Sequence, residues 1–394
     1  MKTVKNSQIK KIALVTHSIP HFEVSLYRAI SSNPYLELMV FYSHEIGIKE
    51  RFDPLYNRTI QWGVPLLDGY SHQLLKNRLE IIRALKKGKF DAVIVYGYND
   101  LLKILTIITC RIIGIPLIFR GTATLLDHRD AGRIKQMLKR VVLKFIFKQF
   151  SAFLVGGTYN RDYFRYYGVE DERMFFVPFT VDVERFIKAT KHYKPQREKI
   201  RQKIGLNFPI AILFVGTLTP IKGPHILLSA FHKLAQVNKD VCLLIAGDGV
   251  LMDELQRYAQ KHNLSSRVKF LGFVDQNELP KIYLSSDFVV FPSLSDTWAR
   301  AVNEAMACGL PVIASRKVGA TGDIVKDGVN GFIVREGDVE DLAAKMQILV
   351  GNPEMREKMG RNSKRIIEQW TYEAAIPNVI KAIEYVCKCK YDKI

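Results

Sequence analysis

The chain alternates between short apolar runs and longer segments in which apolar residues recur every few positions. Such runs are typical of strands buried on both faces of a parallel sheet, and the segments between them are typical of covering helices. In the first half the runs are 11–16, 36–42, 91–96, 116–119 and 152–155. In the second half they are 211–215, 241–246, 268–273, 287–291 and 312–314. This alternation predicts an α/β fold with two doubly wound parallel sheets.

The length of 394 residues favours two domains, because single hydrophobic cores rarely grow beyond about 250–300 residues. A charged segment at 188–207, poor in residues of the buried type, separates the two sets of predicted strands. We interpret this segment as a linker with a surface helix. The sequence therefore predicts one domain at 1–187 and a second at 208–371.

The formal net charge is +19, and most of the excess lies in the first half of the chain. Residues 1–150 contain 24 Lys and Arg against 11 Asp and Glu, whereas residues 151–394 contain 34 against 28. This charge favours an anionic partner such as a membrane surface or nucleic acid. No recognition module for nucleic acid accompanies the cations, so nucleic-acid binding is the less favoured interpretation.

The sequence contains no run of about 18 apolar residues, and the basic segment 1–11 lacks the features of a signal peptide. The five cysteines show no metal-ligand spacing, and their odd number suits reduced thiols. These features predict a cytoplasmic chain, which could associate peripherally with the inner face of the cell membrane.

The segment 133–150 contains no acidic residue and predicts an amphipathic helix. One face of this helix is apolar and is formed by Ile134, Leu138, Val141, Val142 and Phe145. Cations flank that face, with Lys135 and Lys139 on one side and Arg133, Arg140, Lys144 and Lys148 on the other. The pattern suits a helix at an anionic membrane surface, and it equally suits a helix packed on its own sheet.

A loop with one lysine between two glycines follows the predicted strand 211–215. Gly216 and Thr217 open this loop, and Lys222 and Gly223 close it. Glycine lets the backbone approach a diphosphate, and a lysine ammonium stabilises the negative charge of a departing phosphate. The loop is therefore a candidate phosphate site.

Two carboxylates lie eight residues apart after the predicted strand 287–291. Asp296 stands in a loop, and Glu304 stands in a helix that we expect to begin near Thr297, since Asp and Thr favour helix N-termini. Gly309 ends that helix, and another apolar run follows it. The loop then lies at the carboxyl end of a strand, where open α/β sheets bind ligands.

These motifs resemble, in their order over residues 211–345, those of retaining GT-B glycosyltransferases of family 4, the glycosyl transferases group 1. The resemblance implies two Rossmann-like domains facing a cleft, of which 208–371 binds a nucleotide-sugar donor and 1–187 binds the acceptor. It also implies that a C-terminal helix at about 372–394 joins the first domain. In this family the acid matching Asp296 contacts the donor sugar, and the acid matching Glu304 binds the nucleotide ribose. The lysine matching Lys222 stabilises the leaving diphosphate.

The same resemblance supplies further donor contacts. The candidates are Gly216, Thr217, Gly247, Asp248, Phe273, Val274, Thr297, Trp298 and Arg300. Three positions depart from the family pattern: Thr217 replaces an arginine, Asp296 replaces the commoner glutamate, and Thr-Trp-Ala at 297–299 replaces Gly-Phe-Gly. We expect the departures at 296–299 to affect the choice of sugar, and Arg300 is our candidate for the missing phosphate cation.

The resemblance is looser in the first half of the chain, and acceptor contacts there rest on single residues. His17 and His21 follow the first predicted strand and could orient an acceptor hydroxyl or phosphate. Arg120 follows the strand 116–119 and could grip an acceptor phosphate, although it could equally be a structural ion-pair partner.

The sequence thus predicts a glycosyltransferase that moves a sugar from a nucleoside diphosphate sugar, preferably a UDP-sugar, to an acceptor hydroxyl with retention. We expect the acceptor to be a saccharide or lipid-linked, as in the assembly of bacterial surface polysaccharide or glycolipid. No Asp-x-Asp pair in a metal-binding context is present, so we expect neither a metal nor a cofactor beyond the donor. The alternatives are a nucleotide-sugar epimerase or a phosphorylase of the same fold, or a nucleic-acid-binding protein.

Overall fold

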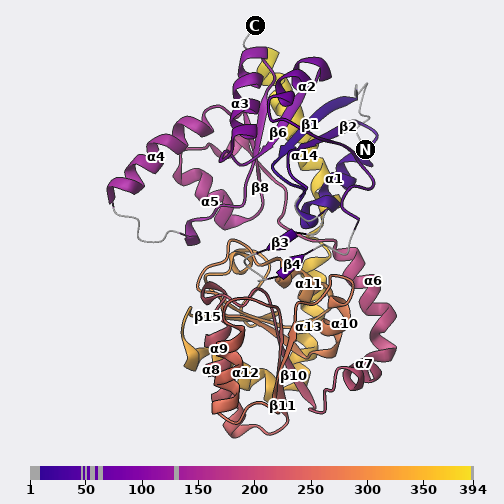
Figure 1. Cartoon of the computed structure of the whole chain (residues 1–394), viewed down its shortest axis with the longest axis vertical. Coiled ribbons are helices and arrows are strands. Elements are labelled where there is room, and N and C mark those ends of the chain that lie inside the picture. Colours follow the sequence, from indigo (N-terminus) through magenta and orange to yellow (C-terminus); the bar gives the residue numbers. More distant parts are fainter. Residues whose placement is uncertain are drawn as a thin grey trace. The chain divides into compact units, whose positions relative to one another are not determined.

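The computed structural model describes residues 9–45, 48, 51–53, 58–60, 65–127 and 133–391. The chain forms two compact units, each with its own parallel sheet (Figure 1). Unit 1 is made of residues 1–50, 65–179 and 372–394, and unit 2 is made of residues 51–64 and 180–371. The C-terminal segment therefore belongs to the same unit as the N-terminal half.

The sheet of unit 1 has seven parallel strands in the order β5-β2-β1-β6-β7-β8-β9. Their bounds are β1 (Lys10–Thr16), β2 (Leu36–Tyr42), β5 (Ser71–Leu74), β6 (Ala92–Tyr96), β7 (Leu117–Arg120), β8 (Ala152–Val155) and β9 (Met174–Phe176). The five strands predicted from apolar runs are confirmed to within one residue at each end. The pattern missed β5 and β9, because β5 is an exposed edge strand and β9 has only three residues.

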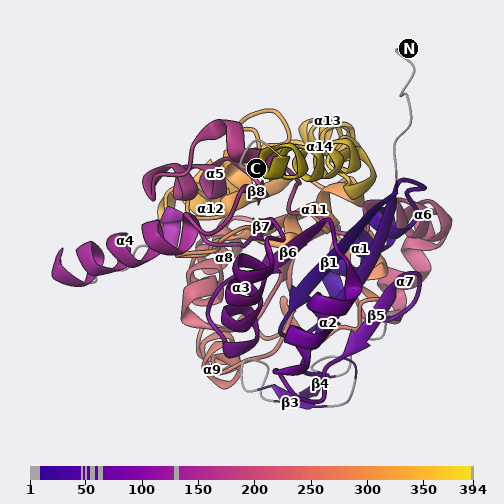
Figure 2. The same cartoon turned by 90° about the horizontal axis from the view of Figure 1, so that it is seen from above.

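Helices cover both faces of the unit 1 sheet. The helices are α1 (Val24–Ser31), α2 (Glu80–Gly88), α3 (Leu101–Ile113), α4 (Arg133–Phe147), α5 (Thr158–Tyr166) and α14 (Tyr372–Tyr391), with 3₁₀ turns η1 (His21–Glu23), η2 (Leu125–Asp127) and η3 (Asp171–Arg173). Apolar side chains of α2, α3, α4 and α5 form one core with the strands. Helix α14 packs on α1 and on the strands β6 to β9, and Figure 2 shows it on the opposite side of the sheet from α2 and α3.

The sheet of unit 2 has six parallel strands in the order β12-β11-β10-β13-β14-β15. Their bounds are β10 (Ile210–Val215), β11 (Val241–Ala246), β12 (Val268–Gly272), β13 (Phe288–Phe291), β14 (Val312–Ser315) and β15 (Gly331–Val334). A separate antiparallel pair, β3 (Arg51–Asp53) and β4 (Arg58–Ile60), also belongs to this unit. The five strands predicted here are confirmed, and β15 was missed.

Eight helices are described in unit 2, and they bury its sheet on both faces. They are α6 (Val183–Tyr193), α7 (Arg197–Lys203), α8 (Pro224–Val237), α9 (Met252–Lys261), α10 (Leu279–Ser285), α11 (Arg300–Ala307), α12 (Val339–Gly351) and α13 (Pro353–Ile367), with turns η4 (Lys194–Gln196), η5 (Pro220–Lys222) and η6 (Gly319–Gly322). Residues of α8, α9, α12 and α13 join the strands in one apolar core.

The structure divides the chain earlier than the predicted boundary at 187, and the segment 188–207 forms part of unit 2. The reason is packing. On α6, Phe186 lies against the Tyr283 ring of α10 with 6.1 Å between ring centroids. On α7, Arg201 is buried and donates to the carbonyl oxygen of Ser285 at 2.5 Å. These contacts anchor a segment that its charge alone had marked as a linker.

No helix in the described part of the chain combines the length and the apolar composition needed to cross a bilayer.

Candidate active site

The predicted donor residues lie in loops at the carboxyl ends of adjacent strands in unit 2. In sheet order, Phe273 and Val274 follow β12, Gly247 and Asp248 follow β11, Gly216, Thr217 and Lys222 follow β10, and Asp296, Thr297 and Trp298 follow β13. The winding direction reverses between β10 and β13, because β11 and β12 lie on one side of β10 and β14 and β15 lie beyond β13. Open α/β sheets bind ligands at such a reversal.

The most informative contact at this reversal joins Lys222 to Asp296. The ammonium of Lys222 donates to Oδ2 of Asp296 at 2.5 Å, although the two residues are far apart in sequence. The lysine side chain keeps 30% of its surface exposed and the aspartate 12%. A cation and a carboxylate therefore meet between the loops that follow β10 and β13, with one side open to solvent.

Asp296 also shapes the chain in front of α11. Its Oδ1 accepts hydrogen bonds from the backbone N–H groups of Trp298, at 3.1 Å, and Ala299, at 2.9 Å. These bonds close a turn over 296–299, so α11 begins at Arg300 and not near Thr297 as the sequence suggested. One carboxylate thus both fixes the loop and holds the lysine.

Glycines bring these loops into direct backbone contact. Gly223, which follows Lys222, has φ +69°, and a Cβ there would lie 2.4 Å from the carbonyl oxygen of Pro292 in the β13 loop. A Cβ on Gly247 would lie 1.8 Å from the carbonyl oxygen of Gly216. Neither position accepts a side chain without displacing backbone. The loops after β11, β10 and β13 are therefore packed into one surface.

Glu304 lies one turn inside α11 and is buried. Its Oε2 accepts a hydrogen bond from the phenol of Tyr283 on α10 at 2.8 Å. Burial raises the pKa of Glu304 to about 7, although this phenol and the charges of Arg185 and Arg300 oppose the shift. The carboxyl is thus close to half-protonated at neutral pH and can both donate and accept hydrogen bonds.

Tyr283 and Arg185 were not found by sequence reasoning. Tyr283 is fully buried, and Arg185 on α6 donates to the side chain of Gln276 at 3.0 Å. Neither residue lies in a motif that carries a recognisable spacing to Glu304, so only the packing of α6 and α10 on α11 reveals them.

Trp298 does not occupy the place that we expected from its position beside Asp296. Only 3% of its surface is exposed, and its ring stacks on that of Trp370 with 5.8 Å between centroids. Its Nε1–H donates to Oδ1 of Asn303 at 2.8 Å, and the hydroxyl of Thr180 donates to the carbonyl oxygen of Trp370 at 2.6 Å. The indole therefore fixes the start of α11 inside unit 2.

The remaining donor candidates support the same surface. Arg300 is the first residue of α11, and its charge opposes the rise that burial causes in the pKa of Glu304. Asp248 accepts a hydrogen bond from the N–H of Gly249 at 2.7 Å, which fixes the loop after β11. Phe273 and Val274 are partly exposed after β12. The loop after β14 braces the acidic loop from the other side, since Gly319 N–H donates to the Asp296 carbonyl at 2.9 Å.

Unit 1 has a polar cluster at its own reversal point, between β1 and β6. His17 follows β1 and stacks on His44, with 3.8 Å between ring centroids. Its Nδ1 lies 3.9 Å from Oδ2 of Asp100, the N-cap of α3, and Lys103 lies 2.8 Å from the same carboxylate. Burial, together with His44, lowers the pKa of His17. The hydrogen bonds from Lys103 lower the pKa of Asp100, although burial opposes them.

The other two acceptor candidates differ from His17. Arg120 ends β7 with no exposed surface, and its guanidinium pairs with the equally buried Glu23 at 3.2 Å. It also donates to Tyr96 Oη at 2.6 Å and to the Val177 carbonyl at 3.0 Å. Arg120 is therefore placed as an internal ion-pair partner, the alternative that the sequence left open. His21 lies in η1, partly exposed, with its ring edge-on to Phe22.

Residues 196–366 match the family described as glycosyl transferases group 1. The match lies within unit 2 and contains every loop described above at the carboxyl ends of its strands. An uncharacterized glycosyltransferase of Methanocaldococcus jannaschii is 31% identical over 226 residues, which are 54% of this chain and 62% of that protein. The UDP-Gal:alpha-D-GlcNAc-diphosphoundecaprenol alpha-1,3-galactosyltransferase of Escherichia coli is 28% identical over 282 residues, 68% of each chain. The chain spans about half to two thirds of the length of the curated relatives it matches.

Among solved structures, Anabaena HepE in complex with UDP superimposes with a TM-score of 0.74 at 19% identity, over 95% of this chain and 100% of that one. HepE in complex with UDP-glucose gives a TM-score of 0.68 over 97% and 99%. This likeness shows the fold: the two Rossmann-like units of this chain form the GT-B fold. The segment that matches the glycosyl transferases group 1 model lies in unit 2.

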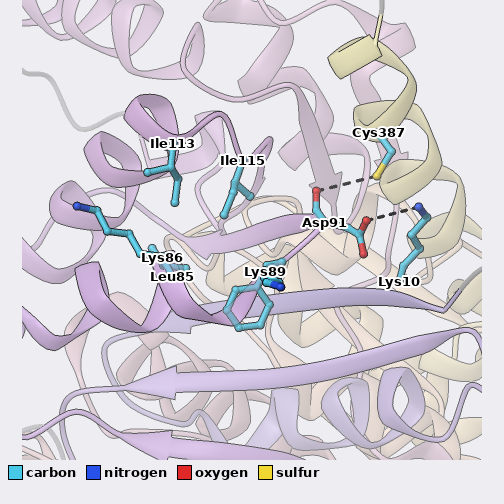
Figure 3. Close-up of a pocket in the computed structure, with 9 residues that line it drawn as sticks. Lys10, Leu85, Lys86, Lys89, Asp91, Ile113, Ile115 and Cys387 are labelled. Atoms are coloured by element: carbon cyan, nitrogen blue, oxygen red, sulfur yellow. Dashed lines mark hydrogen bonds and ion pairs between the residues drawn. The ribbon is translucent and has the colours of Figure 1, made fainter.

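A cavity of about 430 Å³ lies in unit 1 at the amino ends of its strands (Figure 3). It is lined by Lys10, Leu85, Lys86, Lys89, Phe90, Asp91, Ile113, Ile115 and Cys387. The helices α2 and α3 end beside it, and helix C-termini carry partial negative charge, so the lysines there already have a structural use. Lys10 also lies 3.5 Å from Asp91. We assign this cavity no role in donor binding.

Within the described ranges, no group of three or more His, Cys, Asp and Glu side chains is arranged to hold a metal ion.

Proposed function

We propose that this protein is a retaining glycosyltransferase that moves a sugar from a nucleoside diphosphate sugar to an acceptor hydroxyl. The observation that carries the proposal is the contact of Lys222 with Asp296 at the reversal between β10 and β13. The buried Glu304 lies on α11, the helix that follows the Asp296 loop. The three residues belong to the segment that matches the glycosyl transferases group 1 model. An epimerase or phosphorylase of the same fold would use the donor surface equally, so acceptor dependence is what separates them.

In this proposal the donor replaces the contact between Lys222 and Asp296 with one contact to each residue. The diphosphate takes the ammonium of Lys222, which now binds Asp296. The Asp296 carboxylate is then free to accept hydrogen bonds from hydroxyls of the donor sugar. Glu304, whose carboxyl is near half-protonation, accepts hydrogen bonds from the ribose hydroxyls.

The reaction balances without a protein nucleophile. The bond between the anomeric carbon and the diphosphate oxygen breaks, and its electron pair leaves with the diphosphate. Lys222 stabilises the charge that develops there. The acceptor oxygen forms the new bond on the same face of the sugar, and its proton passes to a departing phosphate oxygen. Retention of configuration follows from attack on that face.

UDP-sugars are the donors that we favour. HepE was solved with UDP and with UDP-glucose, and the E. coli relative is named for UDP-Gal and for a diphosphoundecaprenol-linked acceptor. These names support a UDP-sugar donor and a role in the assembly of surface polysaccharide or glycolipid. For the acceptor, the candidate site in unit 1 is the cluster of His17, His44 and Lys103. These basic side chains lie together at the carboxyl end of the sheet, and the His17 side chain is partly exposed.

The first test is a thermal-shift panel of nucleotide sugars on the full chain. A donor at 100 times its dissociation constant should stabilise the protein by about 2.7 kcal/mol. Lys222→Ala should lower transfer about a hundred- to a thousandfold, because one charge-stabilising donor is removed from the leaving group. The exposed Lys239→Ala serves as the matched control and should leave transfer unchanged.

Release of UDP is measured with and without a saccharide acceptor. Release that depends on the acceptor supports transfer, whereas acceptor-independent conversion of the sugar would point to an epimerase. Wild-type transfer by Lys222→Ala, or a panel without any shift, would remove the assigned donor site.

A further inference from the structure

Helix α4 has two apolar faces, and only one of them packs on unit 1. Leu143 and Phe147 are buried in the core, where the Phe147 ring lies 5.3 Å from Phe119 and 5.6 Å from Phe153 between centroids. On a helix with 3.6 residues per turn, Val141 and Phe145 point to the opposite side from these two residues. The core therefore accounts for only one side of α4.

The opposite face of α4 is apolar and exposed. Its members Met137, Leu138, Val141, Val142 and Phe145 each expose between 54% and 69% of their surface. In the described part of the chain, five of the nineteen large apolar side chains that are exposed lie within this short stretch. An apolar patch that no other element covers marks an interaction site. For these residues the packed-helix interpretation of the segment does not hold.

The middle of α4 is exposed on the surface of its unit. Every side chain from 137 to 142 is exposed, and Figures 1 and 2 both show this part of the helix projecting beyond α3 and α5. The Arg140 guanidinium lies 5.1 Å from the centre of the Tyr166 ring on α5, and the apolar side chains of this stretch remain exposed. Among the described residues of unit 1, these side chains are thus open to a flat partner.

Cations border the exposed apolar face on both sides. Lys135 and Lys139 lie along one edge, Arg140 and Lys144 lie along the other, and Lys148 follows the last residue of the helix; all five are exposed. The segment 133–150 contains no acidic residue. Among the described residues, none of these five cations forms an ion pair with a carboxylate. The surface thus combines apolar side chains with cations that no acidic residue of the described ranges pairs with.

This combination selects between the possible occupants of the face. A second copy of the same helix would bring two sets of cations together without any acid, which opposes self-association. An anionic bilayer offers acyl chains for the apolar residues and lipid phosphates for the cations at its edges. Lysine and arginine reach the headgroups while their stems stay beside the apolar face.

We propose that α4 docks unit 1 on an anionic lipid bilayer, with Met137, Leu138, Val141, Val142 and Phe145 in the interface and the flanking cations on lipid phosphates. The docking itself is independent of the proposed transferase activity. Where that activity holds, docking makes a lipid-linked hydroxyl the acceptor class, because it keeps the enzyme at the surface where such acceptors lie.

The experiment is flotation of the full chain with vesicles of phosphatidylcholine alone or mixed with an equal amount of phosphatidylglycerol. We expect binding to the mixed vesicles only, and weaker binding as salt is raised. Val141→Ser with Phe145→Ser should lower binding about tenfold or more, since both side chains leave the apolar face. Lys139→Glu with Lys144→Glu should lower it by at least about fivefold for each cation lost.

Matched controls come from exposed residues of unit 2. Val237→Ser with Ile348→Ser removes exposed apolar surface, and Lys239→Glu with Lys261→Glu makes the same change of charge. Both controls should bind vesicles as the wild type does. All altered side chains are exposed, so the melting temperature reports folding, and the shift produced by a nucleotide sugar reports the donor site separately.

Absence of wild-type binding to the mixed vesicles overturns the proposal, and so does equal binding by the α4 variants and the wild type. Loss of binding in the unit 2 controls equal to that in the α4 variants would show a non-specific charge effect. A dimer in light scattering that Val141→Ser with Phe145→Ser dissolves would assign the face to a second copy instead. In each case the donor shift is unaffected, so failure here leaves the proposed function standing.

Discussion

Units 1 and 2 share a doubly wound sheet, and each places a basic side chain against a carboxylate where the winding reverses. In unit 2 the pair is Lys222 with Asp296 at 2.5 Å, and in unit 1 it is His17 with Asp100 at 3.9 Å. Lys222 offers an ammonium group, whereas burial lowers the pKa of His17 and favours its neutral imidazole. An ammonium suits a diphosphate, which is always charged, and a neutral imidazole suits hydrogen bonding to a hydroxyl.

A second difference concerns how far one basic side chain in each unit is exposed. Arg120 of unit 1 is sealed in an ion pair with Glu23, while Lys222 of unit 2 keeps part of its surface open. A basic side chain therefore stabilises the fold in unit 1, and in unit 2 a basic side chain remains accessible to the donor that we propose. Exposure decides between the two uses, and exposure is a property that a motif does not report.

The largest effect should come from breaking the buried pair in unit 1. Arg120→Met leaves the buried Glu23 carboxyl without its guanidinium partner, which costs about 3–5 kcal/mol of folding free energy. Calorimetry should show a transition that moves to lower temperature while the shift caused by a nucleotide sugar persists in unit 2. Loss of the nucleotide-sugar shift with no change in the melting of unit 1 would contradict this division of roles.

The double variant Arg120→Met with Glu23→Leu provides the control, since it removes both charges. It should recover part of the lost stability, because no buried charge remains unpaired. Equal destabilisation by the single and double variants would mean that packing volume, not charge, explains the effect.

Unit 2 carries the next largest effect, through Glu304. Because burial raises the pKa of this carboxyl from 4.5 to about 7, the folded state binds more protons than the unfolded state between these pH values. Stability should therefore fall as pH rises through this window, by at most about 3 kcal/mol. Glu304→Gln keeps an acceptor for Tyr283 and removes the titration, so it should flatten the profile while weakening nucleotide binding.

Denaturant unfolding of wild type and Glu304→Gln at pH values from 4.5 to 8 measures this effect. Tyr283→Phe is the companion variant, because it removes the phenol that stabilises the carboxylate and should raise the pKa of Glu304 further. Parallel pH profiles in wild type and Glu304→Gln would show that another group titrates in this window.

The sequence predicted the loops of unit 2 in more detail than those of unit 1, for a physical reason. The loops of unit 2 owe their shape to local features, such as a lysine beside Gly223 and an acid that closes its own turn, and these are visible as spacing. The contacts that were missed join distant segments. Trp298 packs on Trp370, and Tyr283 reaches Glu304 from another helix. No local pattern encodes either contact.

Burial decides between the alternatives that the sequence left open at Arg120 and at 133–150. Arg120 is of a residue type that often contacts ligands, but it is fully buried. Its partner Glu23 belongs to η1, far away in sequence from β7, so only the three-dimensional packing shows the ion pair. The amphipathic pattern of α4 was correctly predicted, but its direction was not determined, because a periodic stripe looks the same whether it faces a sheet or a solvent-exposed partner. The start of α11 was placed too early because Asp296 closes a turn before the helix.

The smallest effect tests backbone conformation at equivalent loops of the two units. After β13, Ala299 adopts φ +63°, whereas after β6 of unit 1 a glycine, Gly97, adopts φ +79°. A left-handed conformation costs a residue with a Cβ about 1–2 kcal/mol, and glycine loses about 0.5–1 kcal/mol more conformational entropy on folding. Ala299→Gly should therefore stabilise unit 2 by about 0.5–1 kcal/mol, and Gly97→Ala should destabilise unit 1 by a similar amount. A Cβ at Gly97 meets only the ends of Lys103 and Asn99 beyond 3.5 Å, so φ alone sets the cost. If Ala299→Gly raises the free energy of unfolding in denaturant and Gly97→Ala lowers it, the two loops use one backbone geometry. Changes of the same sign in both variants would show that they do not.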